Sequence, residues 1–226
     1  MISSQDFENM SPAMFRKKIL LSIIVPVLFI TVLWLIRFIQ NQFEISFYGL
    51  GIYPLEARGL TGIIFSPLIH SDADHLLNNS LPLLVLGTAI FYFYSQVAFR
   101  VIGLTWLLTG ILVWLAGREA WHIGASGLVY GLASFLFVSG IIRRYIPLMA
   151  LSLLVAYLYG SMVWGMFPFI YVEVSWESHM LGAATGLILA LWYRHEGPQR
   201  PAPEWYDDDI TEPDIDSKVL KNIEED

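Results

Sequence analysis

The chain has 226 residues, of which 56% are hydrophobic and 15% charged. It contains no cysteine, which excludes structural disulfides, thiolate zinc sites and a cysteine nucleophile. The formal net charge is −7 and no basic arm with interleaved aromatic residues is present, so nucleic acid is not an expected partner. The hydrophobic residues form long blocks of helical length, which indicates an integral membrane protein.

Six apolar segments predict membrane-spanning helices, because about 20 residues rising ~1.5 Å each cross a hydrocarbon core of ~30 Å. They are Ile19–Ile36, Leu76–Tyr94, Val101–Ala116, Ser126–Ile142, Ile146–Gly165 and Ser178–Trp192. The first is long for the apolar region of a signal peptide and lacks a small-x-small cleavage site, so no cleavable signal is expected. The expected fold class is an all-α polytopic membrane protein with six transmembrane helices.

The organisation expected is one membrane domain with short tails. Residues 19–195 form this domain, and residues 1–18 form a cytoplasmic N-terminal segment. The acidic residues 196–226 have little apolar surface to bury, so they are expected to be a disordered cytoplasmic tail.

The basic residues predict the orientation, since cytoplasmic loops are enriched in Lys and Arg. With a cytoplasmic N-terminus, the basic residues on the cytoplasmic side are Arg16, Lys17, Lys18, Arg100, Arg143, Arg144, Arg194, Arg200, Lys218 and Lys221. Only Arg37, Arg58 and Arg118 fall on the opposite, outer side. Both termini are therefore expected in the cytoplasm.

The segment between the first two spans, residues 37–75, mixes aromatic residues with Gly and Pro. It is too broken for a span and too apolar for a free linker. We expect it to lie partly embedded in the membrane interface.

Polar residues open the second span, where they are informative because polar side chains are costly at membrane depth. His75 and Asn79 are four residues apart and share one helix face. They could be donors to an oxyanion, or an interfacial cap and a helix–helix hydrogen bond. His70 and His75 are also possible metal ligands, but no third ligand and no H-E-x-x-H spacing is present, so no metal is expected.

A serine among small residues begins the fourth span, in Gly124-Ala125-Ser126-Gly127. Gly124 can adopt positive φ and lets a substrate backbone approach closely. The unpaired N–H groups at a helix start favour developing negative charge. Ser126 is therefore a candidate nucleophile, and the alternative is a serine N-cap in a glycine-rich turn.

The sixth span begins with His179, and Gly182 and Gly186 follow it. Such a small-xxx-small stripe lets another helix approach closely, and Gly127 and Gly131 form the same stripe on the fourth span. If the stripes face each other, the serine and the histidine both lie at the outer end of a close helix contact. The alternative is ordinary helix packing with an interfacial histidine.

Together these three groups resemble the rhomboid family of intramembrane serine proteases. The resemblance rests on His70-x4-His75-x3-Asn79, Gly124-Ala125-Ser126-Gly127 with Tyr130, and His179-x2-Gly182-x3-Gly186. Their order and spacing and the six-span plan agree over Ile19 to Trp192. One departure is the loop after the first span, where many rhomboids carry a Trp-Arg pair and this chain has Glu56-Ala57-Arg58-Gly59.

The resemblance implies a serine endopeptidase with a catalytic dyad, in which Ser126 is the nucleophile and His179 the general base. It implies cleavage of transmembrane segments of other membrane proteins near the outer membrane face, through an acyl-enzyme. No cofactor is implied, and the membrane implied is a bacterial inner (plasma) membrane. The partners are the transmembrane substrates and the lipid bilayer, and the oligomeric state stays open.

The resemblance also assigns the supporting residues. His75, Asn79, Gly124 and the serine's backbone N–H would stabilise the oxyanion. Tyr130 would pack against the catalytic histidine, and His70 would be structural. Two other functions remain open: a catalytically silent rhomboid-like protein that binds membrane clients, and a small transporter or channel, against which the lack of paired intramembrane charges counts.

Overall fold

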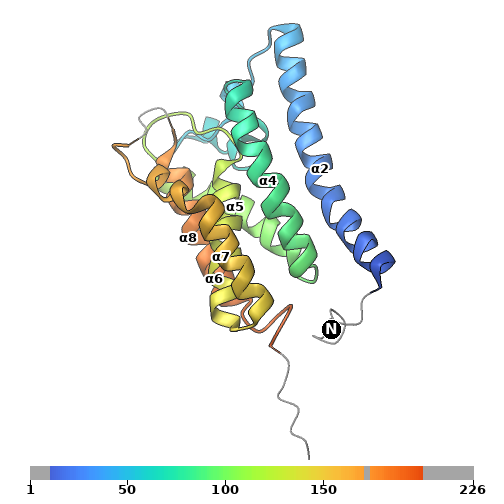
Figure 1. The fold of residues 1–226 in the computed structure, drawn as a ribbon. Coiled ribbons are helices and arrows are strands. Elements are labelled where there is room, and N and C mark those ends of the chain that lie inside the picture. Colours follow the sequence, from blue (N-terminus) through green and yellow to red (C-terminus); the bar gives the residue numbers. More distant parts are fainter. Residues whose placement is uncertain (1–10, 171–173, 201–226) are drawn as a thin grey trace, which may run out of the picture.

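The computed structural model describes residues 11–170 and 174–200, and these residues form a bundle of helices (Figure 1). The helices are α2 (Pro12–Phe43), α3 (Gly62–Phe65), α4 (Ala73–Phe93), α5 (Ala98–Ala116), α6 (Ser126–Arg143), α7 (Ile146–Tyr159) and α8 (Trp176–Trp192). Four short 3-10 segments accompany them: η1 (Tyr48–Leu50), η2 (Ala57–Gly59), η3 (Ser66–Leu68) and η4 (Gly160–Met166). The predicted cytoplasmic tail lies mostly outside the described residues, as does the first part of the N-terminal segment.

Five segments of the described chain are long and apolar enough to cross a membrane. They are Pro12–Phe43, Ala73–Phe93, Ala98–Ala116, Ser126–Arg143 and Ile146–Met166. The last helix of the bundle, α8, has 17 residues and so a length of about 25 Å. The all-α membrane fold predicted from the sequence is confirmed.

Helix α2 is longer than predicted at both ends. Its start is fixed by Ser11, whose side chain accepts a hydrogen bond from the Met14 N–H, and by Pro12 in the first turn. It continues past Arg37, which the sequence placed in the loop, and ends where Glu44 adopts a left-handed conformation with φ 52°. The helix packs chiefly on α4, where Pro26 lies against Gly87.

Helix α6 is the centre of the bundle. It is the most buried of the candidate spans, and it packs against α4, α5, α7 and α8. Its contact with α8 is made through glycine: a Cβ atom at Gly182 would collide with the backbone of Gly127, and one at Gly186 with the backbone of Gly131. The two predicted stripes therefore face each other.

The predicted fifth span is not one continuous α-helix. Helix α7 ends at Tyr159, and η4 continues the segment from Gly160 to Met166 as a 3-10 helix. Gly160 is the first residue of this change, consistent with the weak helix propensity of glycine.

The segment between α2 and α4 is shorter than predicted, because α2 continues to Phe43 and α4 begins at Ala73. It packs on α5, where Trp106 donates to the Ile64 carbonyl (3.1 Å) and Trp114 to the Glu56 carbonyl (3.0 Å). Arg58 has no tryptophan beside it in this loop. Its guanidinium instead lies 5.5 Å from the ring centroid of Trp121, which precedes α6, and 4.1 Å from that of Tyr53.

The glycine contact between α6 and α8 gives a stability prediction. Gly186→Val places a branched side chain against the Gly131 backbone, which cannot move aside, so it should destabilise the domain by ~1–3 kcal/mol or more. The melting temperature of the purified protein in detergent measures this. Gly103→Ala is the control, because a Cβ there meets nothing within 4 Å. Equal melting temperatures for Gly186→Val and wild type would contradict the close helix contact.

Candidate active site

A cavity of about 730 Å³ lies where α4, α6 and α8 begin. Most of its polar lining comes from these three helices and the residues just before them. The candidate residues that line it are His75, Asn79, Ser126, Tyr130 and His179. Asn78, Ser175, His122 and Arg118 line it as well. The structure thus brings three groups that are far apart in the sequence to one cavity.

Ser126 is the first residue of α6, and the backbone before it is held by two hydrogen bonds. The Gly124 N–H donates to the Ser66 carbonyl (2.9 Å), and the Ala125 N–H donates to Nε2 of His70 (3.3 Å). Both N–H groups are therefore engaged. The Ser126 N–H belongs to the first turn of α6, where N–H groups have no partner within the helix.

Gly124 acts through its conformation and its size rather than through its N–H. Its φ is +103°, a region that residues with a side chain rarely adopt. A Cβ atom on it would lie 2.7 Å from the ring of His75. Gly124 therefore lets the histidine ring come directly against the backbone that precedes Ser126.

His70 lies before α4 and orders the same loop. Because Ala125 donates to Nε2, the proton of a neutral His70 ring must be on Nδ1. Burial lowers the pKa of His70 from 6.5 to about 3, and the nearby His75 adds to this shift. His70 is thus a neutral acceptor at physiological pH, and it contacts His75 edge-on with ring centroids 5.0 Å apart.

His179 and Tyr130 form a stacked pair in the buried part of the site. Their ring centroids are 4.1 Å apart and their planes differ by 8°. Segment η4 holds both rings: His179 Nδ1 is 2.8 Å from the Gly165 carbonyl, and the Tyr130 hydroxyl donates to the Met162 carbonyl (2.7 Å). A carbonyl only accepts, so Nδ1 carries the proton and Nε2 of the neutral ring has a free lone pair.

No hydrogen bond joins Ser126 to His179 among the residues that the structure describes. Ser126 is half-buried and His179 is buried, and both line the cavity. A nucleophile and its base are often farther apart without substrate than in the reacting complex.

His75 and Asn79 lie one turn apart on α4, and each already makes one hydrogen bond. The Ser71 hydroxyl donates to Asp72 (2.6 Å), so Ser71 Oγ accepts from Nδ1 of His75 (3.2 Å). The other nitrogen of His75 then carries a proton only when the ring is an imidazolium. Asn79 donates one N–H to the His75 carbonyl (3.0 Å) and has a second N–H to offer.

Three residues of the site had no role in the sequence analysis. Gly165 supplies the backbone carbonyl that lies 2.8 Å from Nδ1 of His179. His122 and Ser175 are joined by a hydrogen bond of 2.6 Å beside the cavity. No local pattern identifies these residues, because each acts through a partner distant in sequence.

Among the described residues, no group of three or more His, Cys, Asp or Glu side chains is arranged to hold a metal ion. The groups that line the cavity include hydroxyl, imidazole and amide side chains, together with the carboxylates of Asp72 and Asp74 and the guanidinium of Arg118. A serine hydroxyl, a neutral imidazole and amide donors that line one cavity are the groups that nucleophilic acyl transfer uses.

Comparison with known proteins agrees with this class of membrane protein. The family model described as the Rhomboid domain matches residues 57–196. Uncharacterized proteins of Mycobacterium tuberculosis and Mycobacterium bovis are each 34% identical over 182 residues, covering 77% of this chain and 75% of theirs. An uncharacterized protein of Mycobacterium leprae is 33% identical over 181 residues, covering 76% of this chain and 70% of its own. The chain belongs to the rhomboid family.

The low pKa of His70 gives a prediction about stability and pH. Its pKa in the folded protein is about 3 and in the unfolded chain near 6.5, so between these values the unfolded state binds the extra proton. The stability from His70 is present above pH 6.5 and is lost as the pH falls below it, by about 1.4 kcal/mol per pH unit.

Melting temperatures between pH 7.5 and 4.5 measure this loss. His70→Gln keeps an acceptor and does not titrate, so its melting temperature should fall less steeply than that of wild type. His195→Gln removes an exposed histidine and should behave like wild type. Parallel curves for wild type and His70→Gln would show that His70 is not buried as a neutral ring.

Proposed function

We propose that this protein is an intramembrane serine endopeptidase that cleaves transmembrane segments of other membrane proteins near the outer membrane face. The observation that carries the proposal is the shared cavity: Ser126 and His179 both line it, and the Gly165 carbonyl leaves Nε2 of His179 as a free base. Membership of the rhomboid family supports it.

In the proposed reaction, His179 Nε2 removes the proton from the Ser126 hydroxyl as the oxygen attacks a peptide carbonyl. The tetrahedral oxyanion accepts hydrogen bonds from the Ser126 N–H and the second N–H of Asn79, with His75 adding one when its ring is protonated. The protonated His179 gives its proton to the leaving amine. His179 then removes a proton from water as it attacks the acyl carbonyl, and returns that proton to the Ser126 oxygen as the ester bond breaks.

The position of the cavity fits a substrate within the bilayer. Helix α6 has 18 residues, a length of about 27 Å, which is shorter than a ~30 Å core and so allows its first residue to lie below the membrane surface. The polar lining gives water a place to reach the site. A substrate helix must unwind before attack, because its carbonyls are hydrogen-bonded, and helix-weakening residues at the cleavage point favour this.

The orientation we propose places both termini in the cytoplasm of a bacterial cell, with the protein in the plasma membrane. Arg100, Arg143 and Arg194 gather at the end of the bundle opposite the cavity, where Arg143 donates to the Arg194 carbonyl (2.8 Å). Figure 1 shows that α2 begins and α8 ends at this same end. A basic cytoplasmic side is typical of inner-membrane proteins.

Removal of the dyad should abolish cleavage. Wild type in proteoliposomes with a model transmembrane substrate should cut it, whereas Ser126→Ala and His179→Ala should show no cleavage, because neither has an activated nucleophile. Ser139→Ala is the matched control, since it removes a hydroxyl from the same helix away from the cavity. Equal cleavage by wild type and Ser126→Ala contradicts the dyad. Binding of the substrate by wild type without cleavage would favour the client-binding function instead.

Asn79→Ala tests the oxyanion donor. Loss of one such donor typically costs roughly 10²–10³ in rate, so kcat should fall by about that factor with little change in KM. Asn78→Ala is the control: Asn78 also lines the cavity, but its side chain is exposed, whereas that of Asn79 is buried. A lowered melting temperature with unchanged kcat would make Asn79 a packing residue only.

A further inference from the structure

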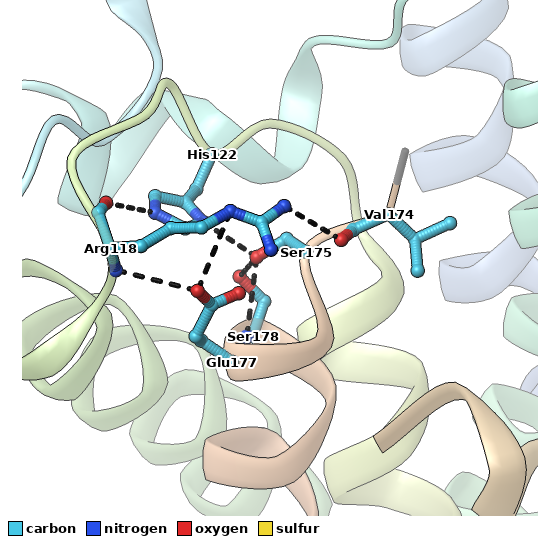
Figure 2. Close-up of polar contacts among 6 residues, drawn as sticks. All are labelled: Arg118, His122, Val174, Ser175, Glu177 and Ser178. Carbon is cyan, nitrogen blue, oxygen red and sulfur yellow. Dashed lines mark hydrogen bonds and ion pairs between the residues drawn. The ribbon is translucent and has the colours of Figure 1, made fainter. Parts of the chain in front are cut away.

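A second polar cluster lies beside the cavity and joins the segment before Ser126 to the start of α8. Figure 2 shows its members, Arg118 and His122 from the loop between α5 and α6, and Ser175, Glu177 and Ser178 from the start of α8. His122 and Glu177 are each 2% exposed. The proposed catalytic chemistry uses neither of them.

The hydrogen bonds of the cluster have a defined direction. The Arg118 carbonyl lies 3.0 Å from His122 Nε2, and since a carbonyl only accepts, Nε2 carries a proton. Burial lowers the pKa of His122, which keeps the ring neutral and leaves Nδ1 as an acceptor. The Ser175 hydroxyl therefore donates to Nδ1 (2.6 Å) and accepts from the Ser178 N–H (3.3 Å).

An ion pair also joins the loop before α6 to the start of α8. Glu177 Oε1 lies 3.6 Å from Nε of Arg118 and 3.4 Å from its backbone N–H, and Arg118 also donates to the Val174 carbonyl (3.0 Å). A buried carboxylate is costly without a partner, so this guanidinium fixes where α8 can begin relative to the loop. The other oxygen of Glu177 has no hydrogen-bond partner among the described residues.

The cluster provides side-chain contacts that can set the relative register of α6 and α8, which the glycine contact provides only weakly. Backbone contacts through Gly127 and Gly182 let α6 and α8 come close, but bare backbone offers few interlocking side chains to set their relative register. The loop is tied to the segment between α2 and α4 by paired backbone bonds between His122 and Ile52 (2.9 and 2.8 Å). Among the described residues, its side-chain hydrogen bonds to the α8 side all belong to this cluster.

We propose that His122 and Glu177 are positioning residues that align the nucleophile with the base. His122 lies four residues before Ser126, and Glu177 lies two residues before His179, so the cluster links the two proposed catalytic side chains through short stretches of chain. This inference rests on the proposed dyad. A displacement of about 1 Å between reacting groups is enough to lower a rate by 10²-fold.

The first test separates alignment from substrate binding. Glu177→Gln keeps the shape of the side chain and removes its charge, and it should lower kcat by roughly 10- to 100-fold with KM for a model transmembrane substrate within about twofold of wild type. Labelling of Ser126 by a small fluorophosphonate should slow by a similar factor, because no transmembrane helix is bound in that reaction. Glu56→Gln is the matched control, since Glu56 pairs with Arg58 in an exposed ion pair on the same side of the bundle, and it should match wild type.

The second test asks whether His122 and Ser175 act through their mutual hydrogen bond. His122→Ala and Ser175→Ala should each lower kcat, and the double variant should lose no more than the worse single variant. His122→Asn retains a polar group at the position of Nδ1 and should recover part of the loss. The linkage would be overturned if the loss of kcat in the double variant equalled the product of the two single losses. It would also be overturned if His122→Asn recovered none of the lost kcat.

The failure of this inference is distinct from failure of the proposed function. If Ser126→Ala is inactive while the His122 and Glu177 variants keep wild-type kcat and labelling rate, the dyad holds and the positioning role is wrong. Activity that falls only in step with the melting temperature, with an unchanged labelling rate at low temperature, would also overturn it. If Ser126→Ala remains active, the proposed function itself fails.

Discussion

The backbones of α6 and α8 touch, and the site is built on that contact. No side chain fits between Gly127 and Gly182, or between Gly131 and Gly186. Lipid provides no hydrophobic force to drive helices together, so such contacts rely on van der Waals packing at the closest possible approach. This approach brings the first turns of two helices more than fifty residues apart in sequence onto one cavity.

A membrane domain can hold polar groups at this depth only if each has a partner or reaches water. The site meets this condition mainly with backbone carbonyls: Gly165 for His179, Met162 for Tyr130 and His75 for Asn79. Carbonyl partners fix the direction of each side chain without adding a charge. The ion pair of Arg118 and Glu177 is the charged exception: its arginine side chain is 42% exposed, whereas its carboxylate side chain is 3% exposed.

The sequence predicted the features whose signals are local. The lengths of the apolar segments located the spans, and the spacing of His75 and Asn79 and of the glycine pairs placed those residues on single helix faces. The first helix was predicted too short because its ends are set by capping: the Ser11 cap and the left-handed Glu44 are not part of the apolar run. Hydropathy alone therefore located the membrane span within α2 but did not predict the two ends of the helix.

Contacts between residues distant in sequence could not be predicted from local sequence patterns. The loop after α2 is shaped by Trp114, which binds a carbonyl 58 residues away, and by Trp121, the ring near Arg58. The Trp-Arg pair of many rhomboids is a pattern of neighbouring residues in the sequence, whereas a guanidinium requires only an aromatic face within reach. The cluster around His122 was not predicted for the same reason, because its partners Ile52 and Ser175 are distant from it in sequence.

The partner of His179 also bears on how a dyad works without a third acid. A carboxylate behind the imidazole would stabilise the imidazolium more strongly than a carbonyl does, but a buried charge carries a large desolvation cost in a bilayer. The Gly165 carbonyl fixes the tautomer and orientation at a smaller cost, and Tyr130 stacked on the ring limits its rotation. Segment η4 turns both carbonyls toward α6 and α8, so the change from α-helix to 3-10 helix at Gly160 is part of the site's construction. In the proposed mechanism, orientation from backbone carbonyls takes the place that a buried acid has in a catalytic triad.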